Sequence, residues 1–293
     1  MKLHLFAPIS AMLALAAVAA DSHDFVPARP DARIGDWEGK GSVVQVYADA
    51  GGKLQGAILP AFDQPNARPS AVRPIDDIDL AGFKQVARPS PTLGAKPPAG
   101  AIVLFDGTHL DAWATKSGKD WLKPAGPASW KIVDGAMEVV PAADSLITKR
   151  NFGDAHVHLE FRTLGAPTNS GIYLQTRYEV NINETYGHFE GTPSGGLDNC
   201  TDVKPRIRAS RPPLAWQTLD IDFIAPRFDA AGRKTAAALA TVRLNGVTLY
   251  ERQELNLPKG AAGRLGEAAQ GPFMLQEHGS PLQFRNIWVV EKK

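Results

Sequence analysis

The sequence predicts an all-β protein, namely a β-sandwich or jelly roll preceded by a small N-terminal β unit. About nine or ten segments alternate apolar and polar residues or form short apolar runs between turns, as half-buried strands do. Asp134-Gly135 and Asn245-Gly246 each separate two short apolar runs, which is the strongest local signal of a β-hairpin. The 27 Gly and 23 Pro residues indicate many turns, which suits an all-β architecture better than a helical bundle.

The N-terminus predicts a cleaved secretory signal peptide over residues 1–20. Lys2 precedes an apolar stretch that begins at Leu3 and ends in the small residues Ala17-Val18-Ala19. A membrane anchor is the alternative, but the stretch contains Pro8 and is short for a bilayer span. We therefore expect a secreted or periplasmic protein with no membrane attachment after cleavage.

Two further segments precede the sandwich. Residues 35–86 form the predicted small β unit, with two strands around the turn at 49–52 and a completing segment at 77–86. Residues 87–101 carry prolines at positions 89, 91, 97 and 98, which predicts a semi-extended Pro-rich linker and a domain boundary.

Residues 102–293 form the predicted sandwich domain. Its expected strand segments and hairpins lie at 129–140, 155–162, 170–182, 216–226, 241–250, 271–279 and 282–291. The short stretch 234–240 is compatible with a helix but fits a strand lead-in better. Residues 183–215 follow no period and are rich in Gly and Pro, and we expect them to form an ordered loop that borders a site.

Charge and cysteine content exclude several classes of function. The 32 Lys and Arg residues balance 31 Asp and Glu residues, which leaves no basic footprint for nucleic acid or acidic membranes. Cys200 is the single cysteine, so no internal disulfide can form, and an inert, partly buried thiol is favoured over a catalytic one. No dinucleotide fingerprint, phosphate loop or CxxC motif is present, so the sequence supports no nicotinamide or nucleotide cofactor.

The segment 170–182 is the best-equipped polar surface of the chain. Its even positions are mostly apolar and its odd positions are mostly polar, which predicts one long strand with an apolar and a polar face. A hairpin with a turn at Thr176-Arg177 is the alternative. We take Gln175, Arg177 and Asn181 as candidate substrate-binding residues and Glu179 as the candidate catalytic base.

The predicted sandwich domain contains five motifs in a fixed order. They are LFDGTHLDAW (104–113), NSGIYLQTRYEVNI (169–182), SRPPLAWQTLDIDFIAPRFDAAGRK (210–234), VRLNGV (242–247) and LQEHGSPLQFRNIWV (275–289). With these motifs the chain resembles the 3-keto-disaccharide hydrolase family over about residues 101–293. The resemblance implies a concanavalin-like jelly-roll fold. The chain departs from the usual motifs of the family at Asn181, at Glu277 and at Leu214-Ala215.

The resemblance also implies a reaction on glycosides that are already oxidised to a ketone at C3. A base removes the acidified C2 hydrogen, the enolate expels the group on C1, and water adds back. Glu179 is the expected base, and His278 the expected acid–base partner, enolate donor or metal ligand. A divalent metal is a possible cofactor. An upstream sugar C3 oxidoreductase is implied, since the chain has no redox-cofactor motif of its own.

Four further residues complete the predicted site. Glu160 is expected to lie on a strand near 170–182, so that it would share one floor with Glu179. Asn169 either bonds a sugar hydroxyl or satisfies the backbone of a turn, and Gln276 is a candidate ligand of the substrate. Trp216 either stacks on a sugar face or packs in the core. His156 and His158 have the spacing of a strand chelate, but a half-exposed strand face is the commoner outcome.

Two other functions fit the same residues. A non-catalytic β-sandwich that binds glycans would show an aromatic and amide-rich face. An ordinary glycoside hydrolase would place two carboxylates about 5–10 Å apart across a groove. In every case the expected partner is an oligosaccharide or glycoside.

Overall fold

The structure is a computed structural model, and it describes residues 25–118, 120–257 and 261–292. The predicted signal peptide lies outside the described residues. Nearly all regular structure is β, as predicted, and two large antiparallel sheets pack face to face. Within the described part of the chain, no helix is long and apolar enough to cross a membrane.

The first large sheet has eight strands. Seven of them follow one another in the order β10 (Lys131–Val133), β11 (Ala136–Glu138), β24 (Leu282–Glu291), β13 (Ala155–Thr163), β18 (Gln217–Ile224), β21 (Ala238–Leu244) and β22 (Val247–Leu255). The eighth strand, β7 (Ile102–Phe105), also pairs with β24.

The second large sheet has seven strands. Their order is β17 (Leu197–Asp198), β16 (Tyr178–Asn183), β15 (Asn169–Leu174), β23 (Gly271–Leu275), β12 (Leu146–Phe152), β8 (Trp113–Lys116) and β9 (Pro124–Pro127). The inner faces of the two sheets enclose one hydrophobic core, in which Ile172 and Val180 of the seven-stranded sheet meet Val157 and Leu219 of the eight-stranded sheet. This arrangement is the predicted jelly-roll sandwich.

The two dipeptide signals form the hairpins that the sequence predicts. Asp134 and Gly135 connect β10 to β11, and Asn245 and Gly246 connect β21 to β22. All four residues have positive φ, between 49° and 79°, as the two-residue hairpin turn requires.

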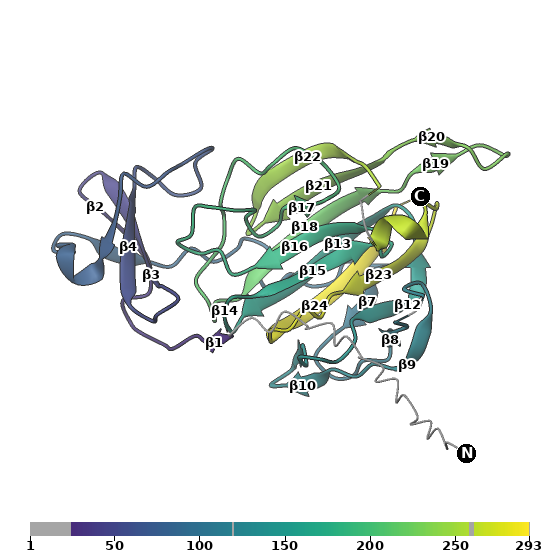
Figure 1. The fold of residues 1–293 in the computed structure, drawn as a ribbon, viewed down its shortest axis with the longest axis horizontal. Helices are drawn as coiled ribbons and strands as arrows, with labels where there is room; N and C mark the ends of the chain where they lie inside the picture. Colours follow the sequence, from purple (N-terminus) through teal and green to yellow (C-terminus); the bar gives the residue numbers. More distant parts are fainter. Residues whose placement is uncertain (1–24, 119, 258–260, 293) are drawn as a thin grey trace, which may run out of the picture.

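Residues 35–86 form a separate five-stranded antiparallel sheet, which we call the small unit. Its order is β5 (Ala71–Pro74), β4 (Leu54–Leu59), β3 (Ser42–Ala48), β2 (Gly35–Gly39) and β6 (Lys84–Val86), with a 3-10 turn at Ile75–Asp77. Figure 1 shows the small unit at one end of the sandwich. Tyr186 of the loop after β16 reaches into it and donates a 2.8 Å hydrogen bond to Asp36.

Three short elements complete the fold. β1 (Val26–Pro27) pairs with β14 (Gly165–Ala166), and a second 3-10 turn covers Ala262–Leu265. The hairpin of β19 (Arg227–Phe228) and β20 (Lys234–Ala236) extends away from the sandwich, on the side opposite the small unit (Figure 1). Residues 234–240 thus lie in strands β20 and β21, as the sequence favours.

The Pro-rich segment 87–101 packs on the outer face of the eight-stranded sheet. Thr92 donates a 2.6 Å hydrogen bond to Asp220, and the Gly94 amide donates one of 2.6 Å to Glu160. The segment therefore covers polar side chains of the sheet, among them Glu160, a predicted site residue.

Candidate functional site

Residues 169–183 form a β-hairpin, so the prediction of one long strand is wrong. β15 and β16 pair antiparallel from Asn169↔Asn183 to Leu174↔Tyr178, and a three-residue loop connects them. The φ angles of Gln175 and Thr176 are 52° and 61°, which turns the chain sharply. Because the loop has an odd number of residues, the parity of the side chains is the same in both strands. The even positions still face the core, and the odd positions still face outward.

The outward side chains form rows across the seven-stranded sheet, because register aligns them from strand to strand. The first row is Asp198, Glu179, Tyr173, Met274, Ile147 and Ala114. The second row is Asn181, Gly171, Gln276, Ser145 and Lys116, joined by the hydrogen bonds Gln276 N to Gly171 O and Lys116 N to Ser145 O. We call the outer surface formed by these rows, together with Asn169 and His278, the polar face.

Glu179 is the most perturbed carboxyl group of the polar face. Only 8% of the residue is exposed, and burial raises its pKa to about 7. The Tyr173 hydroxyl donates a 2.7 Å hydrogen bond to Oε2, which opposes the rise, and the charge of Asp198 adds to it. A carboxyl group with a pKa near neutrality is well matched to transferring protons at physiological pH.

Tyr173 holds Glu179 in place through a short chain of hydrogen bonds. Gln276 Nε2 donates a 3.1 Å hydrogen bond to the Tyr173 hydroxyl, which in turn donates to Glu179. Burial and the neighbouring Glu179 charge raise the pKa of Tyr173 far above its usual range, so the phenol remains a neutral donor. Tyr173 is not among the predicted site residues, although its odd position in the alternating segment places it on the outward face.

Two buried polar atoms of the polar face have no hydrogen-bond partner in the described part of the chain. They are Asn181 Nδ2, a donor, and Gln276 Oε1, an acceptor. Buried polar groups are usually paired, so an unpaired donor and acceptor on one row indicate a place for a polar ligand. Gly171 lies between them in the row and has no side chain of its own.

Gly171 also sets the position of the Glu179 carboxyl. A Cβ at residue 171 would lie 3.0 Å from Glu179 Oε1 and 3.2 Å from its Cγ. The carboxyl group can therefore lean over the backbone of β15 only because residue 171 is glycine.

His278 and Asn169 lie on the polar face, but at its end near the small unit. Asn169 Nδ2 and His278 Nδ1 are 3.1 Å apart, and the His278 side chain is exposed. The register places this pair two rows away from Glu179, which is about 13 Å along the strands at the usual rise per residue. Glu179 and His278 thus lie on the same face, with their backbones about two rows apart.

Lys116 is a second group that sequence analysis missed. It ends β8 with only 7% exposure, and its ammonium group lies 5.1 Å from the centre of the Trp121 ring and 3.4 Å from Asp144 Oδ1. It places a cation on the second row, on the same surface as Gln276. Only the pairing of β8 with β12 reveals this, because residues 113–116 carry no motif for a site.

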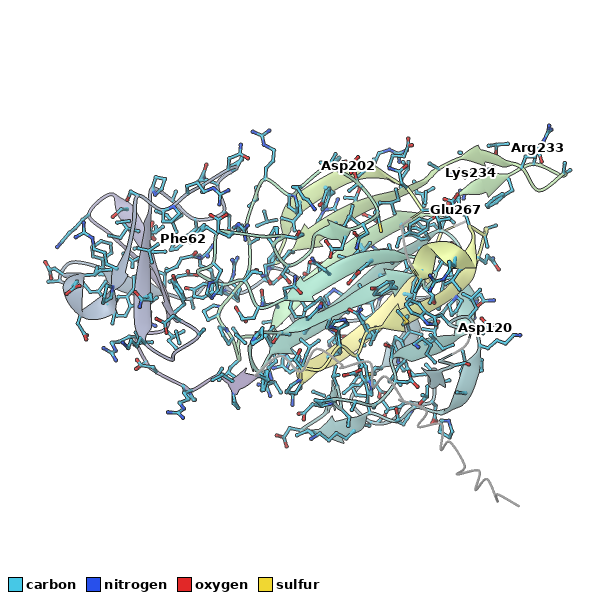
Figure 2. The ribbon with its side chains drawn as sticks, viewed as in Figure 1. Phe62, Asp120, Asp202, Arg233, Lys234 and Glu267 are labelled. Carbon is cyan, nitrogen blue, oxygen red and sulfur yellow. The ribbon has the colours of Figure 1, made fainter. Side chains whose placement is uncertain are left out.

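The structure removes Gln175 and Arg177 from the predicted site. Both belong to the loop of the hairpin and are buried, with exposures of 0% and 3%. Gln175 donates to the carbonyl groups of Phe152 and Ala269, and Arg177 donates to Gly266 O. They fasten the loop near Glu267, which Figure 2 shows at the end of the sandwich away from the small unit.

Glu160 and Trp216 are also misplaced by the prediction. Glu160 lies on β13 in the eight-stranded sheet, so it does not share a floor with Glu179. Burial alone would raise the pKa of its carboxyl, but the His158 imidazole, Asn286 Nδ2, the Gly94 amide and Arg285 Nε lower it to about 2. The Trp216 ring is covered by the guanidinium groups of Arg162 and Arg285, at 4.8 Å and 4.0 Å from its centre. Both residues serve the structure of the opposite sheet.

The two histidines of β13 pair with carboxylates of β18. His158 Nδ1 lies 2.7 Å from Asp220, and His156 Nδ1 lies 3.0 Å from Asp222. Among the residues that the structure describes, no group of three or more His, Cys, Asp or Glu side chains could hold a metal ion. The geometry therefore assigns no ligands to the divalent metal that the resemblance allows.

Comparisons with known proteins agree with this architecture. The model of the 3-keto-alpha-glucoside-1,2-lyase-like domain matches residues 100–290. A crystal structure of a "putative glycosyl hydrolase" from Parabacteroides distasonis is 30% identical, with a TM-score of 0.56, over 72% of this chain and 86% of that chain. A second structure so described, from the same organism, is 17% identical with a TM-score of 0.46, over 66% of this chain and 94% of that chain. None of the curated proteins matches.

Proposed function

Since the chain belongs to the 3-keto-alpha-glucoside-1,2-lyase-like domain family, we propose that it cleaves the glycosidic bond of 3-keto-glycosides by elimination followed by hydration. The family and the similar crystal structure indicate a glycosidase-type enzyme that acts on carbohydrates. The observation that carries the finer proposal is the Glu179 carboxyl, which is buried on the polar face, accepts the 2.7 Å hydrogen bond from Tyr173 and has a pKa of about 7, which suits a base.

The proposed reaction needs a base, an anion-stabilising donor and an acid. Glu179 takes the proton from C2, and the electron pair of that bond forms the enolate of the C3 ketone. The enolate then expels the C1 oxygen, which takes up a proton as it leaves, and a C1–C2 double bond conjugated to the ketone remains. Water adds to C1, and a proton returns to C2, so the sum of the steps is hydrolysis.

The second row of the polar face supplies the groups around the sugar. Asn181 Nδ2 is the unpaired buried donor, and we assign it to the C3 oxygen, where negative charge develops. Gln276 Oε1 accepts a hydrogen bond from a sugar hydroxyl group. Because residue 171 is glycine, the Glu179 carboxyl leans toward this row and can approach the same sugar.

The setting of the reaction is part of the proposal. The chain would act outside the cytoplasm after removal of residues 1–20, and a separate oxidoreductase would form the ketone at C3. Asn169 and His278 would contact a sugar unit farther along the polar face, toward the small unit.

One observation favours a second candidate, ordinary glycoside hydrolysis. Asp198 and Glu179 are register partners on adjacent strands, and both project from the outer face of the sheet. Opposite residues of an antiparallel pair lie about 5 Å apart, so a pair of carboxylates is available to an unoxidised glycoside.

The experiment is incubation of the full chain with a 3-keto-disaccharide and with its unoxidised parent. We expect release of monosaccharides from the oxidised sugar alone. Cleavage of the parent at a similar rate would favour the two-carboxylate mechanism, and affinity without turnover of either would favour a glycan-binding protein.

Glu179→Gln tests the residue assignment separately. Loss of a general base should lower kcat by roughly 100- to 10,000-fold. The matched control is Glu251→Gln on the exposed part of β22, which should retain full activity. Full activity of Glu179→Gln would remove Glu179 from the mechanism without affecting the reaction.

A further inference from the structure

A cavity of about 250 Å³ lies between the small unit and the loop that follows β16. The small unit lines it with Gln45, Leu59 and most of residues 61–68, and the sandwich domain lines it with Phe189, Gly191, Pro193 and most of residues 204–208. None of its lining residues belongs to the polar face. Its volume is close to the lower end of the range of small-molecule sites, which is about 300 Å³.

The cavity is strongly basic. Its lining contains four cationic side chains, which are Arg68, Lys204, Arg206 and Arg208. Among the described residues, Asp63 is the one carboxylate that lines it, and Asp63 already pairs with Arg88 at 2.7 Å and with Arg211 at 3.5 Å. The four cations are therefore left without a carboxylate inside the cavity.

Neutral acceptors hold two of these arginines in place. Arg208 donates to the carbonyl oxygens of His188 and Gly191, at 3.0 Å and 2.6 Å, and Arg68 donates to that of Phe189. Burial and the charge of Arg68 lower the pKa of Arg208, and the charge of Glu190 opposes them in part. The nearest acid of Arg68, Glu190, lies 3.6 Å away and is 95% exposed, so it contributes little.

The lining also offers apolar surface for a ring. Phe62 of the small unit (Figure 2) and Phe189 of the loop are both half-buried and border the cavity. One face of Phe62 is covered by the Arg88 guanidinium group, 3.9 Å from the ring centre. A compound that combines a ring with an anionic group matches this combination of aromatic and cationic side chains.

We propose that this cavity is a subsite for an acidic sugar, whose carboxylate is held by the arginines while its ring lies against the phenylalanines. The fork of an arginine matches a carboxylate better than the point charge of a lysine does. This inference rests on the proposed function in one respect, namely that the ligand with the carboxylate is a carbohydrate.

The subsite is connected to the polar face through one segment of chain. The loop that lines the cavity continues into Asp198, the register partner of Glu179, and its Gly196 amide donates a 3.2 Å hydrogen bond to Asn181 Oδ1. An acidic unit bound in the cavity would therefore belong to an extended substrate whose scissile bond lies on the polar face.

The test is calorimetric titration of the full chain with glucuronate, glucose and inorganic sulfate. The double variant Lys204→Gln/Arg206→Gln removes two exposed charges from the cavity. We expect glucuronate to bind more tightly than either other probe, and the double variant to weaken it about tenfold or more, as loss of charge-assisted hydrogen bonds does. The matched control is Arg73→Gln/Lys84→Gln, which removes two exposed charges from the small unit outside the cavity and should change the affinity less than about twofold.

Three results would overturn the proposal. Equal binding of glucose and glucuronate would show that the carboxylate is not recognised. Equal binding of sulfate would show that the cavity takes any anion. Equal loss of affinity in both double variants would indicate a general effect of charge. Turnover of a neutral 3-keto-disaccharide is measured separately. A failure of the proposed reaction is thereby distinguished from a failure of this subsite.

Discussion

The Tyr173 hydroxyl donates a 2.7 Å hydrogen bond to Glu179 Oε2 across the β15–β16 hairpin, directly opposite in register. Burial raises the pKa of Glu179, and the hydrogen bond from Tyr173 limits this rise because it stabilises the ionised form. The pair therefore sets the pH at which the carboxylate becomes available as a base.

Tyr173→Phe should shift the pH dependence of kcat/KM to higher pH. Loss of the hydrogen bond raises the pKa of Glu179 above about 7, so a smaller fraction is ionised at neutral pH. We expect the acid limb of the profile to move up by about one pH unit, with activity largely recovered near pH 9. An unmoved acid limb with a uniformly lower rate would mean that Tyr173 positions the sugar instead.

Gly171→Ala should lower activity without unfolding the protein. The new Cβ would lie 3.0 Å from Glu179 Oε1 and push the carboxyl group away from β15. A displacement of this kind costs roughly 10- to 100-fold in kcat/KM. Gly118→Ala is the matched control, because no atom lies within 4 Å of its added Cβ. If the two variants have equal activity, the carboxyl position is not set by Gly171.

Glu184→Gln should flatten part of the dependence of stability on pH. Burial raises the pKa of Glu184 to about 7 from its ordinary 4.5, although Thr163 and the Tyr186 amide donate to its carboxyl. Between these two pH values the unfolded chain has released a proton that the folded chain retains. The folded state therefore loses stability as pH rises through this window, by roughly 3 kcal/mol at most.

Urea unfolding at pH 5 and pH 8 measures this effect. The free energy of unfolding of Glu184→Gln minus that of the parent protein should be larger at pH 8 than at pH 5, because only the parent loses stability when Glu184 ionises. Glu179 titrates in the same window in both proteins, so it cancels in the comparison. An identical difference at the two pH values would show that the carboxyl of Glu184 ionises normally.

Cys200 should resist alkylation in the native protein. Its side chain is fully buried, and burial raises the pKa of the thiol to about 12, so almost no thiolate exists at pH 8. Iodoacetamide should leave the folded chain unmodified and add one group per chain in denaturant, as mass spectrometry would detect. Rapid labelling of the folded chain would show that the Cys200 thiol is accessible and reactive.

The sequence by itself determined the elements whose signals are local. Asp134-Gly135 and Asn245-Gly246 form their hairpins because two residues at positive φ suffice to define the turn. The alternation of residues 170–182 also assigned the correct faces to Tyr178, Glu179 and Asn181. It did so despite the wrong prediction of a single strand, because a loop of three residues preserves parity.

Only the tertiary structure decided which polar side chains share a surface. Glu160 and Glu179 both lie on strands with polar faces, but the strands belong to different sheets, and the Pro-rich segment covers Glu160. Lys116 joins the row of Gln276 because β8 pairs with β12 and β12 pairs with β23. Lys116 and Gln276 are more than a hundred residues apart in the chain. Such neighbours are set by long-range pairing and by what packs over each face, and alternation within one strand contains no information about either.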